Sequence, residues 1–320
     1  MPLLIGSTLL ALSSSNAMFA WMMLELNMLT FIPLIKTNDS TAETEASIKY
    51  LIPQSFGSSL FMTSILLMTL TPHSKALATT ALILKLGGVP LHSWFPMVMQ
   101  SISPATGLIL TTWQKVAPLL LLTSPHLTYS PIVITSSLMS ALWGSVAGLN
   151  QTNLLKLMAF SSINHLGWLM MASLFSPLIP TLYLSAYSLS ALPIFTYMQT
   201  PLVKTYNTTL TPPLNSYTQL TLITNLLSLA GMPPLSMFMS KLPIILLMAQ
   251  NLVLPLALLL MSAMVSLYFY LSLSIMMTLN LNSPPELTNK STPQTTTLIV
   301  YTTSLLFQFS ALPLWLTTSL

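Results

Sequence analysis

The sequence contains no cysteine and no arginine, and nine lysines with five acidic residues are all the charge on its 320 residues. Without cysteine the chain cannot form disulfides, thiolate metal sites or cysteine-ligated iron–sulfur clusters. A soluble domain of this length would carry roughly 80 charged side chains, a quarter of its residues. Because so few charges cannot cover a hydrated surface, we exclude a soluble enzyme, a nucleic-acid-binding protein and a disordered protein.

Apolar residues make up 53% of the chain and its mean hydropathy is +0.77, as is typical of a membrane protein with many spans. A helical crossing needs about 20 mostly apolar residues. We therefore predict an all-α, polytopic transmembrane helical bundle in a single domain, residues 1–320, with a kink near Asn251 or Pro255 in its longest span. The eleven expected spans are 2–14, 16–35, 46–70, 75–98, 103–122, 129–149, 152–173, 178–199, 216–240, 242–278 and 296–317.

Two expected spans are interrupted by glycine and proline, at Gly88–Pro90 and at Gly231–Pro234. Proline removes a backbone donor and clashes with the preceding turn, so both helices should be broken there. Paired broken helices indicate an inverted-repeat transporter, with halves of roughly 1–122 and 129–278 and a C-terminal helix at about 296–317. The alternative is that these residues serve only helix packing, because glycine and proline are common in membrane helices.

Four charges lie in the middle of expected spans, where each costs roughly 3 kcal/mol or more: Glu25, Lys85, Lys115 and Lys241. The other ten occur in loops or near span ends, including a cluster over residues 36–49 that we interpret as a solvated rim. A static ion pair between Glu25 and Lys85 would explain part of the buried set. A proton relay would explain all four, because burial and neighbouring charges shift the pKa of a lysine or glutamate side chain. Lysine can release its proton, whereas arginine effectively never does.

Three further residues are accessory candidates: His92, Lys156 and His165. Lys156 is better explained as an anchor at the membrane rim, and each histidine as a hydrogen-bonded contact between helices; proton transfer is the alternative role. The spacing of the histidines does not indicate a metal site. The chain also lacks a nucleotide-binding loop and a nucleophile motif, so we predict no metal and no cofactor in it.

Several short segments together resemble the antiporter-like membrane-arm subunits of respiratory complex I, the mitochondrial NADH–ubiquinone oxidoreductase. In chain order they are residues 24–29, 44–50, 85–87, 113–115, 148–152, 160–168, 231–235 and 267–270. The resemblance implies an eleven-span animal-type form that lacks three N-terminal helices of the bacterial version. It also implies a central hydrophilic axis lined by Glu25, Lys85, Lys115 and Lys241. The sequence departs from the family at three places. The family often has an acidic residue at the position of Met97, an arginine at that of Leu155 and a proline at that of Ser240.

The resemblance further implies a multi-pass subunit of the mitochondrial inner membrane that translocates protons within a NADH:ubiquinone reductase. NADH, FMN, iron–sulfur clusters and ubiquinone would then bind other subunits, and the partners would be membrane-arm subunits and lipids, with no nucleic acid and no soluble substrate besides protons. Two alternatives remain open. A stand-alone cation/proton antiporter would transport as a purified single chain. In a scaffold with static ion pairs, neutralising the charges would change assembly but not pumping.

Overall fold

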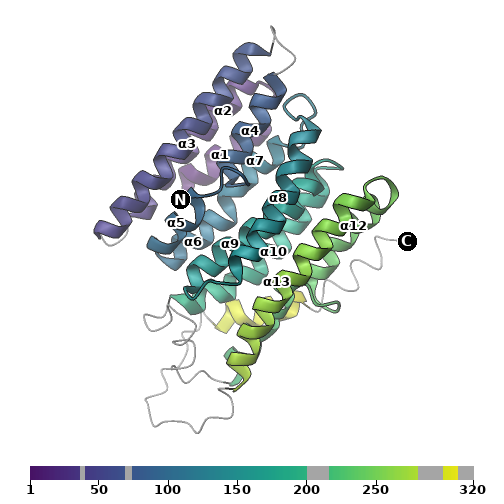
Figure 1. Cartoon of the computed structure of the whole chain (residues 1–320). Coiled ribbons are helices and arrows are strands. Elements are labelled where there is room, and N and C mark those ends of the chain that lie inside the picture. The colour runs from purple at the N-terminus through teal and green to yellow at the C-terminus, as the bar shows by residue number, and fades with distance from the viewer. Residues whose placement is uncertain (37–39, 69–73, 200–215, 280–297, 309–320) are drawn as a thin grey trace.

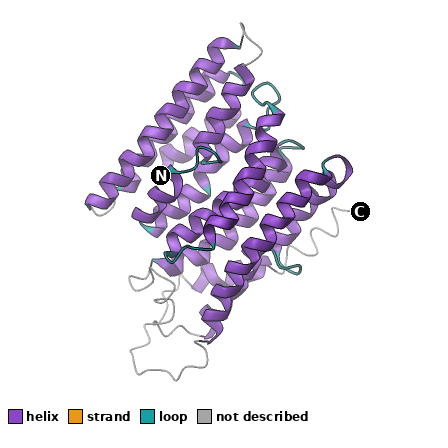
Figure 2. Cartoon of the chain, viewed as in Figure 1, coloured by secondary structure: helices purple, strands orange, loops and turns teal. Residues whose placement is uncertain are grey.

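The computed structural model describes residues 1–36, 40–68, 74–199, 216–279 and 298–308, which form one bundle of helices (Figure 1). No strand occurs among these residues (Figure 2), so the predicted all-α class is confirmed for them. The helices are α1 (Pro2–Ser13), α2 (Ala17–Ile35), α3 (Thr41–Leu67), α4 (Ser74–Leu86), α5 (Trp94–Ser101), α6 (Pro104–Thr111), α7 (Trp113–Leu121), α8 (Ser130–Gly148), α9 (Leu154–Ser173), α10 (Leu178–Met198), α11 (Ser216–Ala230), α12 (Ser236–Asn251) and α13 (Val253–Leu279), followed by an apolar helix over Leu298–Gln308.

Four of the described helices are long and apolar enough to cross a membrane: α2, α8, α10 and the segment Val253–Thr278 of α13. In Figure 1, α2 and α3 lie at one side of the bundle and α12 and α13 at the other, with α8, α9 and α10 between them. This arrangement makes α9 a central helix, and its side chains from Ser161 to Ser173 are all buried.

The expected break near Gly88–Pro90 is present between α4 and α5. Gly87 has a φ of +76°, the Gly87 N–H donates to Leu84 O at 3.1 Å, and the Gly88 N–H donates to Ile83 O at 2.9 Å. This pair of bonds is a Schellman motif, which requires a positive φ at the residue after the helix. Glycine is favoured there because it has no Cβ atom to clash in that conformation. The break therefore follows from local backbone chemistry.

The second break, between α11 and α12, repeats that geometry. Gly231 has a φ of +88°, its N–H donates to Ser228 O at 2.9 Å, and the Met232 N–H donates to Leu227 O at 3.2 Å. The expected boundary at residues 240–242 is wrong, because α12 continues to Asn251. The sequence predicts a kink near Asn251 or Pro255. The helix is interrupted at the first of these places, where α12 ends at Asn251 and α13 begins at Val253.

The expected continuous span 103–122 is wrong, because the helix is interrupted at Thr112 between α6 and α7. The Thr112 hydroxyl donates to Leu108 O at 2.7 Å, and the Thr112 N–H donates to the same carbonyl at 3.0 Å. A threonine side chain that competes for the carbonyl four residues earlier bends a helix. As a result, Lys115 lies in the first turn of α7 instead of mid-helix.

Helices α8 and α9 approach so closely that glycine is required on both. A Cβ on Gly144 would lie 2.6 Å from Asn164 N, and a Cβ on Gly167 would lie 2.6 Å from Ser137 O. Small residues allow backbones to approach in this way in membrane bundles. The contact fixes the position of α9 within the bundle.

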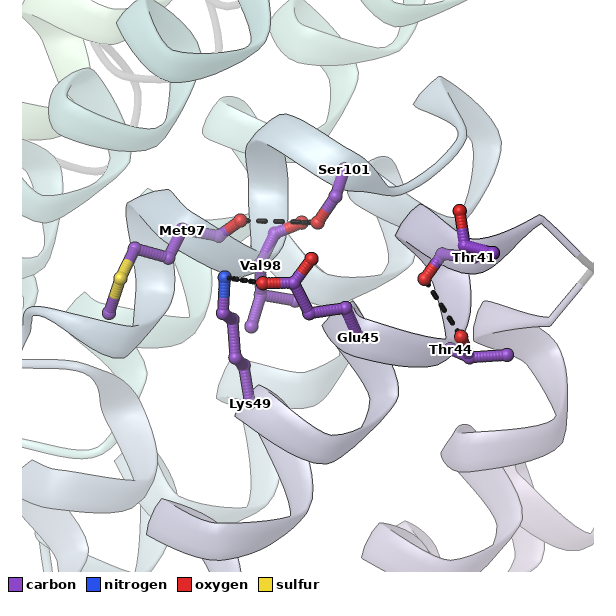
Figure 3. Close-up of polar contacts among 7 residues, drawn as sticks. All are labelled: Thr41, Thr44, Glu45, Lys49, Met97, Val98 and Ser101. Carbon is purple, nitrogen blue, oxygen red and sulfur yellow. Dashed lines mark hydrogen bonds and ion pairs between the residues drawn. The ribbon is translucent and has the colours of Figure 1, made fainter.

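The charged cluster at the start of α3 is largely the rim that the sequence predicts. Figure 3 shows Lys49 Nζ paired with Glu45 Oε1, and the two atoms are 2.5 Å apart. Both side chains are substantially exposed, and such a pair contributes little to stability. The assignment of Glu43 to this solvated rim is wrong, because Glu43 is buried in the first turn of α3, where its N–H donates to the Ser40 hydroxyl.

Candidate functional site

The three mid-span lysines are all buried, none more than 6% exposed, and two of them share a cavity. Lys85 and Lys115 line a space bounded by α2 to α7 that is large enough for about one water molecule. The polar residues that line it with them are Asn27, Tyr50, Gln54, Trp94 and Gln114. The folding of α4 and α7 therefore brings together two lysines that are 30 positions apart in the sequence.

The backbone around Lys85 is satisfied by side chains from other helices. Gln54 of α3 donates to Lys85 O at 3.0 Å, and the Trp94 indole N–H donates to Leu84 O at 3.2 Å. Both are carbonyls of the last turn of α4, which lack intrahelical partners; Leu84 O also accepts from the Gly87 N–H of the Schellman motif. The Lys85 side chain passes over Gly57, whose added Cβ would lie 3.1 Å from Lys85 Cγ. The break, Gln54 and Gly57 together set the path of the Lys85 side chain.

Glu25 of α2 acts electrostatically on Lys85 but is not in direct ion-pair contact with it. Its Oε2 atom is buried without a hydrogen-bond partner among the described residues. The static ion pair considered from the sequence is therefore absent from this conformation. The carboxylate remains close enough to act on the Lys85 ammonium without touching it.

Lys115 is held against the middle of the bundle. Its ammonium donates to Ser162 O of α9 at 3.0 Å and lies 5.4 Å from the centre of the Phe95 ring and 5.8 Å from that of Tyr187. The two rings supply cation–π stabilisation where water is scarce. Lys115 thus connects the cavity to α9.

His165 lies one turn further along α9, between two lysines. Both Lys115 and Lys241 act electrostatically on its ring. Its Nδ1 atom is hydrogen-bonded to the Tyr183 hydroxyl at 2.8 Å, and the Tyr187 ring lies 5.1 Å away. Its Nε2 atom is buried without a partner among the described residues. The bond to Tyr183 agrees with the predicted interhelical contact, and the two lysines make His165 part of the same row of groups.

Lys241 of α12 points back toward the break that precedes its helix. A Cβ on Gly231 would lie 3.0 Å from Lys241 Nζ, and the ammonium lies 5.4 Å from the centre of the Trp168 ring. The C-terminal end of α11 carries partial negative charge, which favours a cation at this position. Lys241 is therefore placed by the break on one side and by α9 on the other.

The lysines and His165 meet along one helix. Ser162 contacts Lys115, His165 follows three residues later, and Trp168, three residues further on, contacts Lys241. Ser162 and Trp168 are about 9 Å apart along the axis of α9, at 1.5 Å per residue. The arrangement is a row of titratable groups running from Glu25 through the cavity to Lys241.

Two accessory candidates lie outside this row. The half-buried His92 is hydrogen-bonded through Nδ1 to Pro90 O at 3.3 Å and packs edge-on against Trp143. Lys156 is in the first turn of α9, about 13 Å along the helix from His165. The structure brings neither into contact with the buried lysines.

The sequence reasoning missed the neutral polar residues that support the row. Asn27 and Gln114 share a hydrogen bond of 3.3 Å across the cavity, and Tyr183 and Tyr187 face His165 from α10. Their positions in the sequence could have indicated them. Asn27 follows Glu25 by two residues, Gln114 directly precedes Lys115, and the two tyrosines are four residues apart on one helix face. In the described part of the chain, no three His, Asp or Glu residues lie together as a metal site would need.

Comparison with known proteins identifies relatives over most of the chain. The family described as NADH:quinone oxidoreductase/Mrp antiporter, TM, matches residues 14–77 and 73–268. NADH-ubiquinone oxidoreductase chain 2 of Xenopus laevis is 41% identical over 303 residues, 88% of this chain and 85% of that protein. The protein of the same name from Lumbricus terrestris is 38% identical over 302 residues, 90% of this chain and 88% of that protein.

Solved structures share the fold at lower sequence identity. A chain of respiratory complex I from Thermus thermophilus superposes with a TM-score of 0.80 at 23% identity, over 98% of this chain and 76% of that one. A chain of the Mrp complex from Dietzia sp. DQ12-45-1b gives a TM-score of 0.76 at 16% identity, over 85% of this chain and 58% of that one. The antiporter-like fold expected from the sequence is therefore shared with both.

Proposed function

The chain belongs to the NADH-ubiquinone oxidoreductase chain 2 family, and on this premise we propose that it is a proton-translocating core subunit of the membrane arm of respiratory complex I. As such it is part of an oxidoreductase in the mitochondrial inner membrane, where its partners are the other membrane-arm subunits. The observation that carries the proposal is the row of titratable groups that runs from the half-buried Glu25 through the buried Lys85, Lys115 and His165 to the buried Lys241. Because each mid-membrane charge costs several kcal/mol, such a set indicates function.

In this proposal Lys85 and Lys115 exchange a proton across the cavity that they both line. The space suits a water molecule, and the amides of Asn27 and Gln114 supply polar partners that would orient it. Glu25 adjusts the charge of Lys85 from α2 without forming a direct ion pair. A change in the distance between these two groups would therefore change how firmly Lys85 holds its proton.

From Lys115 the proton passes to Lys241 through His165. The ring lies between Lys115 and Lys241, and both lysines act on it electrostatically. His165 thus occupies the position from which a proton could pass between them. Tyr183 holds the ring by its Nδ1 atom, which leaves Nε2 as the free nitrogen.

We further propose that the helices form eleven spans in two inverted halves, roughly residues 1–122 and 129–278. The broken pairs α4–α5, α6–α7 and α11–α12 each count as one span, and with the helix Leu298–Gln308 the total is eleven. Each half then has five spans, and the fourth span of each half, α4–α5 or α11–α12, is broken. The matching Schellman motifs at Gly87 and Gly231 support this correspondence.

The redox chemistry is assigned to other subunits: NADH, FMN, iron–sulfur clusters and ubiquinone are proposed to bind there. A stand-alone antiporter is the weaker reading, because the relatives that match most of the chain are named as oxidoreductase chains. The static scaffold is also less favoured, because Glu25 and Lys85 form no direct ion pair.

The test is the number of protons pumped per electron in assembled complexes that carry Lys85→Met or Glu25→Gln. We expect both variants to assemble and to pump fewer protons than the wild type. Lys75→Met is the matched control, because Lys75 is exposed and bonds Pro125 O at the surface. Normal stoichiometry in both variants would refute the assignment, and loss of assembly without loss of pumping in the residual complex would favour the scaffold.

A further inference from the structure

Gln308, in the helix Leu298–Gln308, has an amide group that is fully buried and fully hydrogen-bonded. Its Oε1 atom accepts from the Ser236 N–H at 3.2 Å and from the Ser236 hydroxyl at 2.7 Å. Its Nε2 atom donates to Asn225 Oδ1 at 3.1 Å and to the Ser228 hydroxyl at 3.0 Å. A side-chain amide offers two donors and two acceptor lone pairs, so all four are used.

These bonds join the two halves of the broken helix. Asn225 and Ser228 are in the last turns of α11, whereas Ser236 is the first residue of α12. The N-cap residue of α12, Leu235, makes no side-chain cap of its own. Gln308 therefore caps α12 from a separate helix while it holds the end of α11.

A second residue of the same helix strengthens the connection to α11. Ser304 precedes Gln308 by four residues, so the two lie on one helix face. The Asn225 amide donates to the Ser304 hydroxyl at 3.3 Å. Ser304, Gln308, Asn225, Ser228 and Ser236 are all buried, so these bonds are shielded from competing water.

We propose that Gln308 is a positioning residue for Lys241, because it fixes α12 against α11 across the break into which the Lys241 ammonium points. Lys241 follows Ser236 by five residues, and its ammonium lies beside Gly231 at the opposite end of the break. A rotation of α12 about the break would move this ammonium away from Trp168 and His165. The inference rests on the proposed function, since Lys241 belongs to the proton row, the residues Glu25, Lys85, Lys115, His165 and Lys241 that are proposed to carry protons.

Without Gln308, the Ser236 N–H at the start of α12 and Asn225 Oδ1 at the end of α11 would each lose a hydrogen-bond partner. Buried polar groups that lose a partner drive local rearrangement until they find another. The five-residue connection between Ala230 and Ser236 is short, so any rearrangement there is transmitted to the first turns of α12, where Lys241 lies.

The experiment measures electron transfer and the proton-to-electron ratio in assembled complexes carrying Gln308→Met, Lys241→Met, or both. We expect Gln308→Met to keep electron transfer but to lower the ratio toward the Lys241→Met value, and the double variant to match Lys241→Met alone. Thr303→Val is the matched control, because this exposed hydroxyl of the same helix bonds only within the helix, to Val300 O. A wild-type ratio in Gln308→Met, or additive losses in the double variant, would overturn the proposal.

The outcomes separate this inference from the function on which it rests. If Lys241→Met itself pumped normally, the proton row would be refuted, whereas a defect in Lys241→Met with none in Gln308→Met would refute only the positioning role. Should Gln308→Met fail to assemble, Ser236→Ala takes its place, because it removes one of the two bonds to Gln308 Oε1 and keeps the backbone bond. We expect it to lower the ratio less than Lys241→Met does, and an unchanged ratio would again contradict the proposal.

Discussion

Replacing Gly167 with alanine tests whether the close contact between α8 and α9 sets the position of the proposed proton row. The added Cβ would lie 2.6 Å from Ser137 O, 2.8 Å from Ala141 Cβ and 2.9 Å from Ala141 N. Two of these atoms are backbone, which cannot turn aside as a flexible side chain can. Ordinary contact begins at 3.4 Å, so α9 must move away from α8 by about 0.8 Å, the difference between 3.4 and 2.6 Å.

Two opposing energies decide the sign of the effect on stability. Overpacking of this kind costs about 1–3 kcal/mol. Alanine in a helix interior regains about 1 kcal/mol relative to glycine. We therefore expect a net loss of up to about 2 kcal/mol, measured as a lower thermal unfolding temperature of the complex that carries the variant chain.

The same displacement should lower proton pumping, because α9 carries both Ser162 O, which accepts from Lys115 at 3.0 Å, and His165. Gly6→Ala in α1 is the control, because its added Cβ would meet no atom within 4 Å. The reasoning would be refuted if Gly167→Ala matched Gly6→Ala in both unfolding temperature and proton-to-electron ratio.

Two further substitutions probe single contacts of the row. In Gly57→Ala the new Cβ would lie 3.0 Å from Leu84 Cδ2 and 3.1 Å from Lys85 Cγ. We therefore expect the Lys85 ammonium to shift in a high-resolution map and proton pumping to fall. An unmoved Lys85 with normal pumping would contradict this. Tyr183→Phe removes the 2.8 Å bond to His165 Nδ1, a loss of about 1 kcal/mol, and should lower pumping by freeing the imidazole, whereas Tyr129→Phe, at an exposed position, should not. Equal pumping in these two tyrosine variants would exclude an orienting role for Tyr183.

The sequence supports good predictions wherever the cause of a feature is local. Gly87 and Gly231 end their helices because a positive φ suits glycine, so both breaks were predictable from a few residues. The interruption at Thr112 also has a local cause, its hydroxyl bond to Leu108 O. Threonine mid-helix is common and usually harmless, however, so the residue type alone did not reveal it.

Features that depend on which face a membrane helix turns inward were harder to predict. Lipid and protein interior are both apolar, so a helix that contacts each carries little amphipathic signal. The sequence therefore did not indicate that Tyr183 and Tyr187 face His165, or that Gln308 reaches the break between α11 and α12.

The scarcity of charge by itself determined that this chain spans a membrane and singled out Glu25, Lys85, Lys115 and Lys241, because an ionisable group is costly in the middle of a bilayer. Only the tertiary structure decided their order: Lys85 and Lys115 meet in one cavity, and α9 carries His165 between Lys115 and Lys241. The cost of burying a charge is a property of each residue, whereas the titratable group that lies next to it depends on how helices distant in the sequence pack together.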